Sequence, residues 1–252
     1  MEKENKQYKY PDDYINKVLC GNCLELMKKL PDKSVDMILC DLPYGTTACK
    51  WDTIIPFEPL WKEYKRIIKD NGVIILTASQ PFTSILVMSN IKMFKYEWIW
   101  EKPNGTSPFK AKYMPMTNCE EILVFGNGKT KYYPQMEIGK PYKWNSKRSK
   151  GEASNIKQTK ETPIDNKGTR YPKSILKFKQ ERGLHPTQKP VALFEYLINT
   201  YTNEGDLVLD NCAGSGTTGV ACKNLKRNFI LMELDEEYCK IAEKRINENY
   251  KL

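Results

Sequence analysis

The sequence predicts an α/β fold with a mostly parallel sheet and helices on both of its faces. Short apolar runs alternate along the chain with longer segments of helical period, which is typical of repeated strand–helix–strand units. The run at 73–77 (VIILT) is apolar throughout, as strands are when both faces of a sheet are covered. A length of 252 residues is enough for one such core with a modest insertion.

The first half of the chain supplies most of the predicted strands. We expect a strand at 17–20, a helix near 24–30, a strand at 35–40, a helix near 59–69, a strand at 73–77 and two more at 96–101 and 121–125. Pro31 closes the first helix, and the second stops at Asn71-Gly72. From 127 to 182 the pattern fades into a segment rich in turn residues, which indicates an inserted region with little regular core.

Regular structure returns after the hexapeptide HPTQKP at 185–190. We expect a helix near 192–201, a strand at 207–209, a helix to about 225, a strand at 228–232 and a final helix near 236–247. The chain thus has three predicted parts: 1–126, an insertion at 127–182, and 183–252. The first and third parts would form one domain.

Positive charge is concentrated in the predicted insertion. The whole chain has a net charge of +9, while 127–182 alone holds 12 Lys and 3 Arg against 4 Glu and 1 Asp. Aromatic residues are interleaved with these charges: Tyr132, Tyr133, Tyr142, Trp144, Tyr171 and Phe178. This combination favours a surface that binds nucleic acid, and the alternative is a solvated lysine-rich loop.

Composition also excludes several classes of protein. A single histidine, His185, argues against a histidine base and a multi-histidine metal site. Among the eight cysteines only Cys20 and Cys23 form a CxxC pair, so we expect reduced cysteines and no metal. No apolar run is long enough for a membrane span and the N-terminus is polar, which predicts a cytoplasmic protein.

A glycine turn in the sequence LVLDNCAGSGTTG is the first candidate site. Gly214, Gly216 and Gly219 fit the spacing GxGxxG between a strand and a helix, where backbone N–H groups can approach a ligand closely. A nicotinamide or flavin dinucleotide is one possible ligand. Asp210 and the pair Thr217-Thr218 suit a zwitterionic amino-acid group better and favour S-adenosylmethionine. In either case Glu233, after the next strand, is placed to accept hydrogen bonds from ribose hydroxyls.

The second candidate site is the corner Asp41-Leu42-Pro43-Tyr44, directly after a predicted strand. An exocyclic amine on a base is a poor nucleophile because its lone pair is delocalised into the ring. Acceptors on its N–H groups, from the Asp41 carboxylate and the Leu42 carbonyl, would localise that lone pair. Tyr44 offers a ring face on which an extruded base can stack. An ordinary strand-to-turn corner is the simpler interpretation of the same residues.

Together the two sites resemble the amino-methyltransferases of DNA, whose catalytic signature is Asp/Asn/Ser-Pro-Pro-Tyr/Phe. The catalytic corner here precedes the glycine turn, an order similar to that of the beta class, a circular permutation of the fold. The resemblance covers about 18–245. It implies a Rossmann-like methyltransferase fold with an inserted target-recognition region, S-adenosylmethionine as cofactor and double-stranded DNA as partner.

The resemblance also assigns roles to individual residues. Catalysis would belong to Asp41, Leu42, Pro43 and Tyr44. Cofactor binding would belong to Asn22, Cys23, Thr187, Lys189, Asp210, Cys212, Ala213, Gly214, Ser215, Gly216, Thr217, Glu233 and Leu234, with Thr187 and Lys189 near the methionine carboxylate. Contacts to DNA would come from Trp98, Trp100, Lys102, Lys143, Lys147, Arg148 and Arg170, the first three walling the target-base pocket.

Two positions depart from the family pattern. Leu42 replaces the first proline but keeps its carbonyl, and Asn22 stands where an aspartate commonly contacts the cofactor's adenine. Asp41 favours adenine N6 as the methyl acceptor, because cytosine-N4 members more often carry serine there. Cytosine N4, an RNA or protein substrate, and an inactive DNA-binding subunit remain alternatives. A homodimer, a cognate restriction endonuclease and a phage origin are compatible with the sequence.

Overall fold

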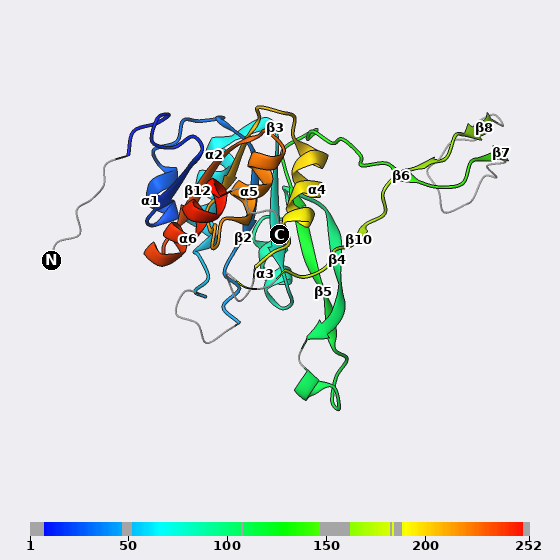
Figure 1. The fold of residues 1–252 in the computed structure, drawn as a ribbon, viewed down its shortest axis with the longest axis horizontal. Helices are drawn as coiled ribbons and strands as arrows, with labels where there is room; N and C mark the ends of the chain where they lie inside the picture. The colour runs from blue at the N-terminus through cyan, green and yellow to red at the C-terminus, as the bar shows by residue number, and fades with distance from the viewer. Residues whose placement is uncertain are drawn as a thin grey trace. The chain divides into compact units, whose positions relative to one another are not determined.

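The computed structural model describes residues 8–46, 52–106, 108–146, 162–181, 183 and 188–248. They form two compact units. The first, called here the sheet unit, comprises Met1–Tyr133 and Ser174–Leu252, and the second, called the ribbon unit, comprises Pro134–Lys173. Each is described by itself (Figure 1).

The sheet unit is built on eight strands in the order β1-β12-β11-β2-β3-β5-β4-β10. All neighbouring strands in this order are parallel except the pairs made by β5, which runs antiparallel to β3 and β4. The strands are β1 (Lys17–Cys20), β2 (Val35–Asp41), β3 (Ile68–Ala78), β4 (Phe94–Thr106), β5 (Thr117–Phe125), β10 (Ile175–Lys177), β11 (Leu207–Asp210) and β12 (Asn228–Glu233). The predicted mostly parallel sheet is confirmed.

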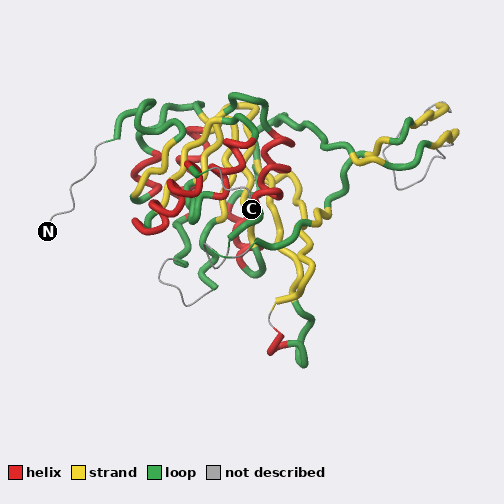
Figure 2. The backbone as a smooth tube through the Cα atoms, viewed as in Figure 1, coloured by secondary structure: helices red, strands yellow, loops and turns green. Residues whose placement is uncertain are grey.

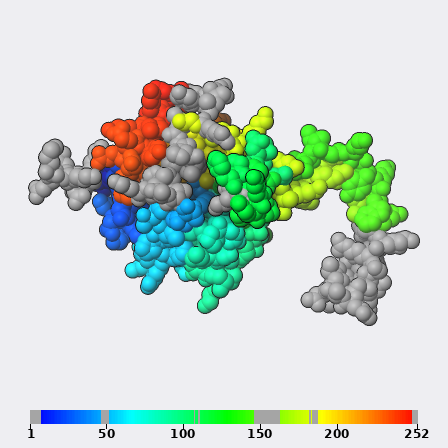
Figure 3. Space-filling model, turned by 90° about the horizontal axis from the view of Figure 1, so that it is seen from below, coloured from blue at the N-terminus to red at the C-terminus, as the bar shows by residue number. Residues whose placement is uncertain are grey.

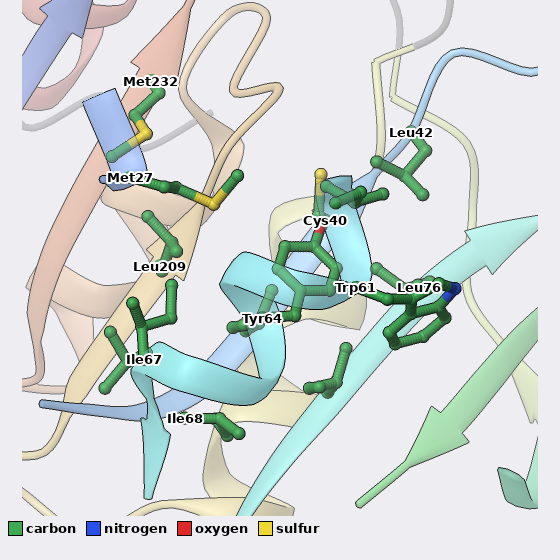
Figure 4. Packing of buried hydrophobic residues seen from close by; sticks show 14 of the residues in the cluster. Met27, Cys40, Leu42, Trp61, Tyr64, Ile67, Ile68, Leu76, Leu209 and Met232 are labelled. Carbon is green, nitrogen blue, oxygen red and sulfur yellow. The ribbon is translucent and has the colours of Figure 1, made fainter. Parts of the chain in front are cut away.

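Helices cover both faces of this sheet, as predicted (Figure 2). They are α1 (Cys23–Met27), α2 (Phe57–Ile67), α3 (Phe82–Ser89), α4 (Val191–Tyr201), α5 (Thr217–Asn224) and α6 (Glu236–Asn247), with a short 3-10 helix η1 (Pro108–Lys110). Alternate side chains of β2 enter different cores. Ile38 packs with α1, α2 and α3, while Met37 packs with α4, α5 and α6. Figure 4 shows the first core, where Trp61 and Tyr64 of α2 lie over the strands.

The pairing of β11 with β2 joins the first and last parts of the chain in one sheet, as the circularly permuted order requires. Val208 lies beside Met37 in this parallel pair, although the two strands are far apart in sequence. The parallel order brings the carboxyl ends of β1, β12, β11, β2 and β3 to one edge of the sheet. We call it the Asp41 edge, because Asp41 ends β2 there. Open α/β sheets bind ligands at this edge, where the strand order changes direction.

Several elements differ from the sequence-based expectation, among them α2, α3 and β10. Helix α2 ends at Ile67 and β3 starts at Ile68, because Ile68 already pairs with Val35 of β2. Helix α3 was not predicted. Nor was β10, which extends the sheet at its edge by pairing with β4 and lies inside the segment predicted as an insertion.

The ribbon unit is shorter than the predicted insertion at 127–182. Residues on either side of it belong to the sheet unit: Lys131 Nζ lies 3.0 Å from Asp36 and 2.7 Å from Asp206, and Trp100 Nε1 donates to the Phe178 carbonyl at 2.9 Å. The ribbon unit contains two antiparallel pairs, β6 (Glu137–Ile138) with β9 (Thr169–Arg170) and β7 (Tyr142–Ser146) with β8 (Thr162–Asn166). Among its described residues only Gly168 is buried, so it has little core of its own.

None of the helices in the described part of the chain is both long and apolar enough to cross a membrane.

Candidate active site

A cavity of about 630 Å³ opens at the Asp41 edge of the sheet. Its walls come from the loops that follow β1, β2, β11 and β12, and from β5 and the start of α4. Most of the predicted catalytic and cofactor residues line it: Asn22, Cys23, Asp41, Leu42, Pro43, Tyr44, Lys189, Asp210, Cys212, Ala213, Gly214, Ser215, Thr217, Glu233 and Leu234. Gly216 is not among the lining residues, and Thr187 lies outside the described residues.

The glycine turn needs glycine for two different reasons. Gly214 (φ +51°) and Gly216 (φ +79°) both adopt the left-handed conformation that side chains disfavour. A Cβ on Gly216 would also lie only 2.8 Å from the Cβ of Ala242 in α6. Gly216 therefore allows α5 and α6 to pack closely, whereas Gly214 faces the cavity.

The carboxylate of Glu233 holds this end of the cavity in shape. It accepts hydrogen bonds from the backbone N–H groups of Gly214 at 2.7 Å, Leu234 at 2.8 Å and Asp235 at 3.0 Å. A carboxylate has about four acceptor positions, so roughly one is left for a ligand hydroxyl. Asn22, on the neighbouring loop, uses Oδ1 to cap α1 through the Leu24 N–H.

At the other end of the cavity, Asp41 is held by three donors. Its Oδ1 accepts hydrogen bonds from the Tyr44 hydroxyl at 2.8 Å and from the Thr77 hydroxyl, and its Oδ2 lies 2.6 Å from Lys189 Nζ. Thr77 belongs to β3 and pairs directly with Asp41 across the sheet. The orientation of the carboxylate is therefore fixed before any substrate arrives.

Lys189 is buried and connects Asp41 to a second acid. Its Nζ lies 3.3 Å from Glu120 of β5, whose other oxygen binds Lys102. Burial alone would lower the pKa of Lys189, but the carboxylates of Asp41 and Glu120 raise it above its usual value. The amine therefore carries a positive charge and keeps the buried group of charges balanced. The resemblance implied a position for Lys189 near the methionine carboxylate, which stays a prediction; the structure shows its ion pair with Asp41.

The ring of Tyr44 already has one face covered. It stacks on Phe82 of α3, with centroids 5.1 Å apart and ring planes at 23°. Burial, together with the charges of Asp41 and Glu120, raises the pKa of Tyr44 well above its usual value. Its hydroxyl is therefore protonated and can donate to Asp41. Lys189 Nζ also lies over this ring, 5.8 Å from its centroid.

Asp210, at the end of β11, is a buried carboxylate that lines the cavity. It accepts hydrogen bonds from the Cys212 N–H at 3.1 Å and from the Thr218 hydroxyl. Burial nevertheless raises its pKa to about 7. A ligand ammonium group placed beside it would favour the ionised form.

Sequence reasoning missed several residues that support the two motifs. Asp52 accepts hydrogen bonds from the N–H groups of Gly45 at 2.8 Å and Thr46 at 2.9 Å, and so shapes the loop after Tyr44. Arg245 of α6 is buried behind the glycine turn and donates to the Thr217 hydroxyl at 3.0 Å. An acid shortly after the corner at 41–44 was a visible signal for Asp52. Arg245 lay in an ordinary charged helix and gave no signal.

Trp98 and Trp100 are not on the cavity wall, which corrects the expectation that they wall a base pocket. Both side chains are buried in the core beneath α4, and Trp98 Nε1 donates to the Tyr201 hydroxyl at 2.7 Å. Alternation along β4 points them at the face of the sheet rather than its edge. Lys102 is also buried and forms an ion pair with Glu120. This ion pair is its connection to the site. Glu120 itself lines the cavity.

The predicted DNA contacts of the basic segment lie in the ribbon unit. Lys143, on β7, is exposed. Arg170 is engaged within the unit: its guanidinium lies 4.5 Å from the ring centroid of Tyr142 and donates to the carbonyl oxygens of Lys140 and Thr169. Lys147 and Arg148 lie outside the described residues.

The seven cysteines that can be described are free thiols. Within the same part of the chain no three His, Cys, Asp or Glu side chains come together as a metal site would require.

The glycine turn and the acidic corner open into one cavity at the switch point of a doubly wound sheet. This arrangement defines an enzyme that presents a bound cofactor to a small polar group of a second molecule. Residues 35–244 match the family described as DNA methylase, and the chain belongs to that family. The prediction of an S-adenosylmethionine-dependent DNA amino-methyltransferase is confirmed, and a dinucleotide oxidoreductase is excluded.

Known relatives align over nearly the whole chain. It is 29% identical to the Type II methyltransferase M2.MboI of Moraxella bovis, over 96% of this chain and 92% of that protein. It is also 29% identical to M2.DpnII of Streptococcus pneumoniae, over 96% and 97% of the two chains. Among solved structures, the M1.HpyAVI complex with S-adenosylmethionine has a TM-score of 0.63 and 27% identity, over 92% of this chain and 98% of that one.

Proposed function

We propose that this chain transfers a methyl group from S-adenosylmethionine to N6 of adenine in double-stranded DNA, with the target base turned out of the helix. The observation that carries the proposal is the position of Asp41, which is held by three donors in the same cavity as the glycine turn. A buried base cannot reach such a cavity while it is stacked in a duplex, so base flipping is part of the proposal.

The acceptor positions of Asp41 explain how an amine would be activated. Three of about four acceptor positions on its carboxylate are filled by Tyr44, Thr77 and Lys189, which leaves one for an amine N–H. The Leu42 carbonyl would accept the second N–H. Two acceptors would draw the nitrogen lone pair out of conjugation with the ring. S-adenosylmethionine, when bound, supplies the electrophilic methyl group.

Features of the other end of the cavity fit this cofactor. The carboxylate of Glu233, oriented by the Gly214 N–H, suits the hydroxyls of an adenosine ribose, and Asn22 and Leu234 line the same cavity. Asp210, with a pKa near 7, suits the ammonium group of the methionine part. We therefore propose Asn22, Asp210, Gly214 and Glu233 as the principal cofactor residues.

The choice of adenine N6 over cytosine N4 rests on Asp41. A solved cytosine-N4-specific enzyme, the PvuII DNA methyltransferase, shares the fold with a TM-score of 0.63 at 18% identity, a similarity that bears on the fold alone. The test is single-molecule sequencing of DNA from a methylation-free host that expresses the chain. We expect N6-methyladenine at one short recurrent sequence. N4-methylcytosine would overturn the assignment of the base, and unmodified DNA would overturn the proposed function.

We further propose that the ribbon unit reads the recognition sequence, because it carries exposed lysines and aromatic rings such as Lys143 and Trp144. We also propose a cognate restriction endonuclease that acts on the same cytoplasmic DNA; the relatives named above are Type II methyltransferases. A homodimer is the proposed assembly. Light scattering of the purified protein tests the dimer, and cleavage of unmethylated but not methylated DNA by a neighbouring gene product tests the endonuclease.

A further inference from the structure

The β4–β5 hairpin extends well beyond the row of residues that contains Asp41. Across the sheet, Asp41 pairs with Thr77, Thr77 with Ile122, and Ile122 with Trp98. From Ile122 back to the start of β5 at Thr117 are five residues, or about 17 Å at about 3.4 Å per residue. Figure 1 shows the hairpin projecting past the other strands, and in Figure 3 it points toward the viewer.

The tip of this hairpin is described by the structure at residues 103–106 and 108–116. Beyond the last strand pair, Thr106 with Thr117, the chain folds through η1, and the Thr106 hydroxyl donates to the Thr117 carbonyl at 3.0 Å. Gly105 packs so closely on Met116 that an added Cβ would lie 2.8 Å from the Met116 side chain. These contacts join the two ends of the tip where it leaves the strands.

These side chains are unusually apolar for so exposed a position. Phe109 is 96% exposed and Tyr113 is 88% exposed, and Met114 and Met116 are exposed beside them. Exposed apolar groups gathered in one place mark a surface that binds a partner. Within the described part of the chain these side chains stay exposed and are available to a partner.

The positive charge of the tip and the length of the hairpin point to a nucleic acid as that partner. The tip contains lysines and no acidic residue, and Lys112 is exposed between the two aromatic residues. It projects from the same edge as Asp41, so a duplex whose target base enters the cavity passes beside it. The grooves of DNA are about 7.5–8.5 Å deep, so an arm of about 17 Å is long enough to enter one. Apolar wedges on proteins that bind in the minor groove insert between base steps.

We propose that Phe109 and Tyr113 contact duplex DNA beside the target base, as a binding element separate from the ribbon unit. This inference rests on the proposed function. The aromatic rings would pack against base or sugar surfaces and help to hold the duplex in the distorted form that an extruded base requires. Lys112 would contact a phosphate next to them.

The test is a double variant, Phe109→Ala with Tyr113→Ala, in the full chain. Loss of one aromatic–base contact weakens binding roughly ten- to a hundred-fold, so we expect the Kd for duplex DNA and the KM for DNA to rise by at least that factor. Affinity for S-adenosylmethionine and the melting temperature should not change, because both side chains are exposed and lie outside the cavity. Met88→Ala is the matched control, since Met88 is 71% exposed but lies on α3.

Salt dependence separates the apolar contacts from the ionic one. Lys112→Gln should lower the slope of log Kd against log salt by about 0.9, whereas the double variant should leave that slope unchanged. Wild-type DNA affinity in the double variant would overturn the inference, even if the wild-type enzyme methylates DNA normally. A change in oligomeric state with unaltered DNA affinity would also overturn it and would assign the tip to contact between copies. If the wild-type chain methylates no DNA, the proposed function fails first and this inference with it.

Discussion

The sheet unit and the ribbon unit differ in how many of their side chains are buried and held by neighbours. In the sheet unit, apolar side chains fill two cores, and acids at strand ends are held by fixed donors before a ligand binds. In the ribbon unit, two short strand pairs leave nearly every described side chain in contact with solvent. The acidic side chains of the cavity are therefore held in place before a ligand binds. The exposed side chains of the ribbon unit, by contrast, would become ordered only when they bind DNA. Four changes test that contrast.

The largest effect is expected at the preorganised end. Asp41→Ala removes the carboxylate that Tyr44, Thr77 and Lys189 hold, and we expect methyl transfer to fall by at least about a thousand-fold. Calorimetric affinity for S-adenosylmethionine should remain close to that of the wild type, since the glycine turn is untouched. Asp70→Ala, which removes an exposed carboxylate remote from the cavity, is the control. Equal turnover of Asp41→Ala and wild type would contradict the catalytic assignment.

Loss of a side chain should lower the free energy of unfolding much more in the sheet unit than in the ribbon unit. Ile38→Ala empties a fully buried position in the first core and should lower the free energy of unfolding by about 2–5 kcal/mol. Ile138→Ala, the same substitution at an exposed position of β6, should change it by less than about 0.5 kcal/mol. Urea denaturation of both variants measures the difference. Similar losses would mean that the ribbon unit has a stabilising core after all.

A smaller effect should appear as a dependence of stability on pH. Because the pKa of Asp210 is raised to about 7 in the folded chain, this group favours folding most at acidic pH. Its contribution is lost as pH rises from the unfolded value near 4 through 7, by up to about 1.4 kcal/mol per pH unit. Asp210→Asn should therefore be relatively more stable than wild type at pH 8 than at pH 5. Equal differences in the free energy of unfolding at both pH values would contradict this.

The smallest effect concerns charge on the ribbon unit. Replacing Lys140, Lys143 and Lys173 by Gln should lower the slope of log Kd for duplex DNA against log salt by up to about 3, with turnover at saturating DNA unchanged.

A control for general charge replaces three exposed lysines of the sheet unit, Lys29, Lys62 and Lys92, in the same way. If the slope of log Kd against log salt falls by the same amount in both triple variants, the lysines of the ribbon unit contribute no more to DNA binding than other exposed lysines.

Sequence patterns predicted the strands of the sheet well because their apolar runs are continuous and end on the acids of the site. They missed α3, since the segment FTSILVMS is apolar on nearly every side and carries no polar face to reveal a helical period. They also missed β10, because a three-residue strand depends on its partner β4 rather than on its own pattern.

The candidate site was predictable where one short motif contains it. The corner at 41–44 and the turn at 210–217 could be identified as motifs and do line one cavity. The chain of contacts from Asp41 through Lys189 to Glu120 could not be predicted, because it joins three elements far apart in sequence. The tryptophans of β4 were misplaced for a related reason. Alternation in a strand shows which side chains share a face, but it does not show which helix covers that face.

The pairing of β2 with β11 has a consequence for engineering. These adjacent strands carry the acidic corner and the glycine turn, yet the long excursion through the ribbon unit separates them along the chain. A cut in that excursion would yield two fragments, one with the acidic corner at 41–44 and the other with the glycine turn at 210–217. Neither fragment alone could form the sheet between them. The protein is therefore a natural candidate for a split enzyme, in which methylation reports that two fused partners have brought the halves together.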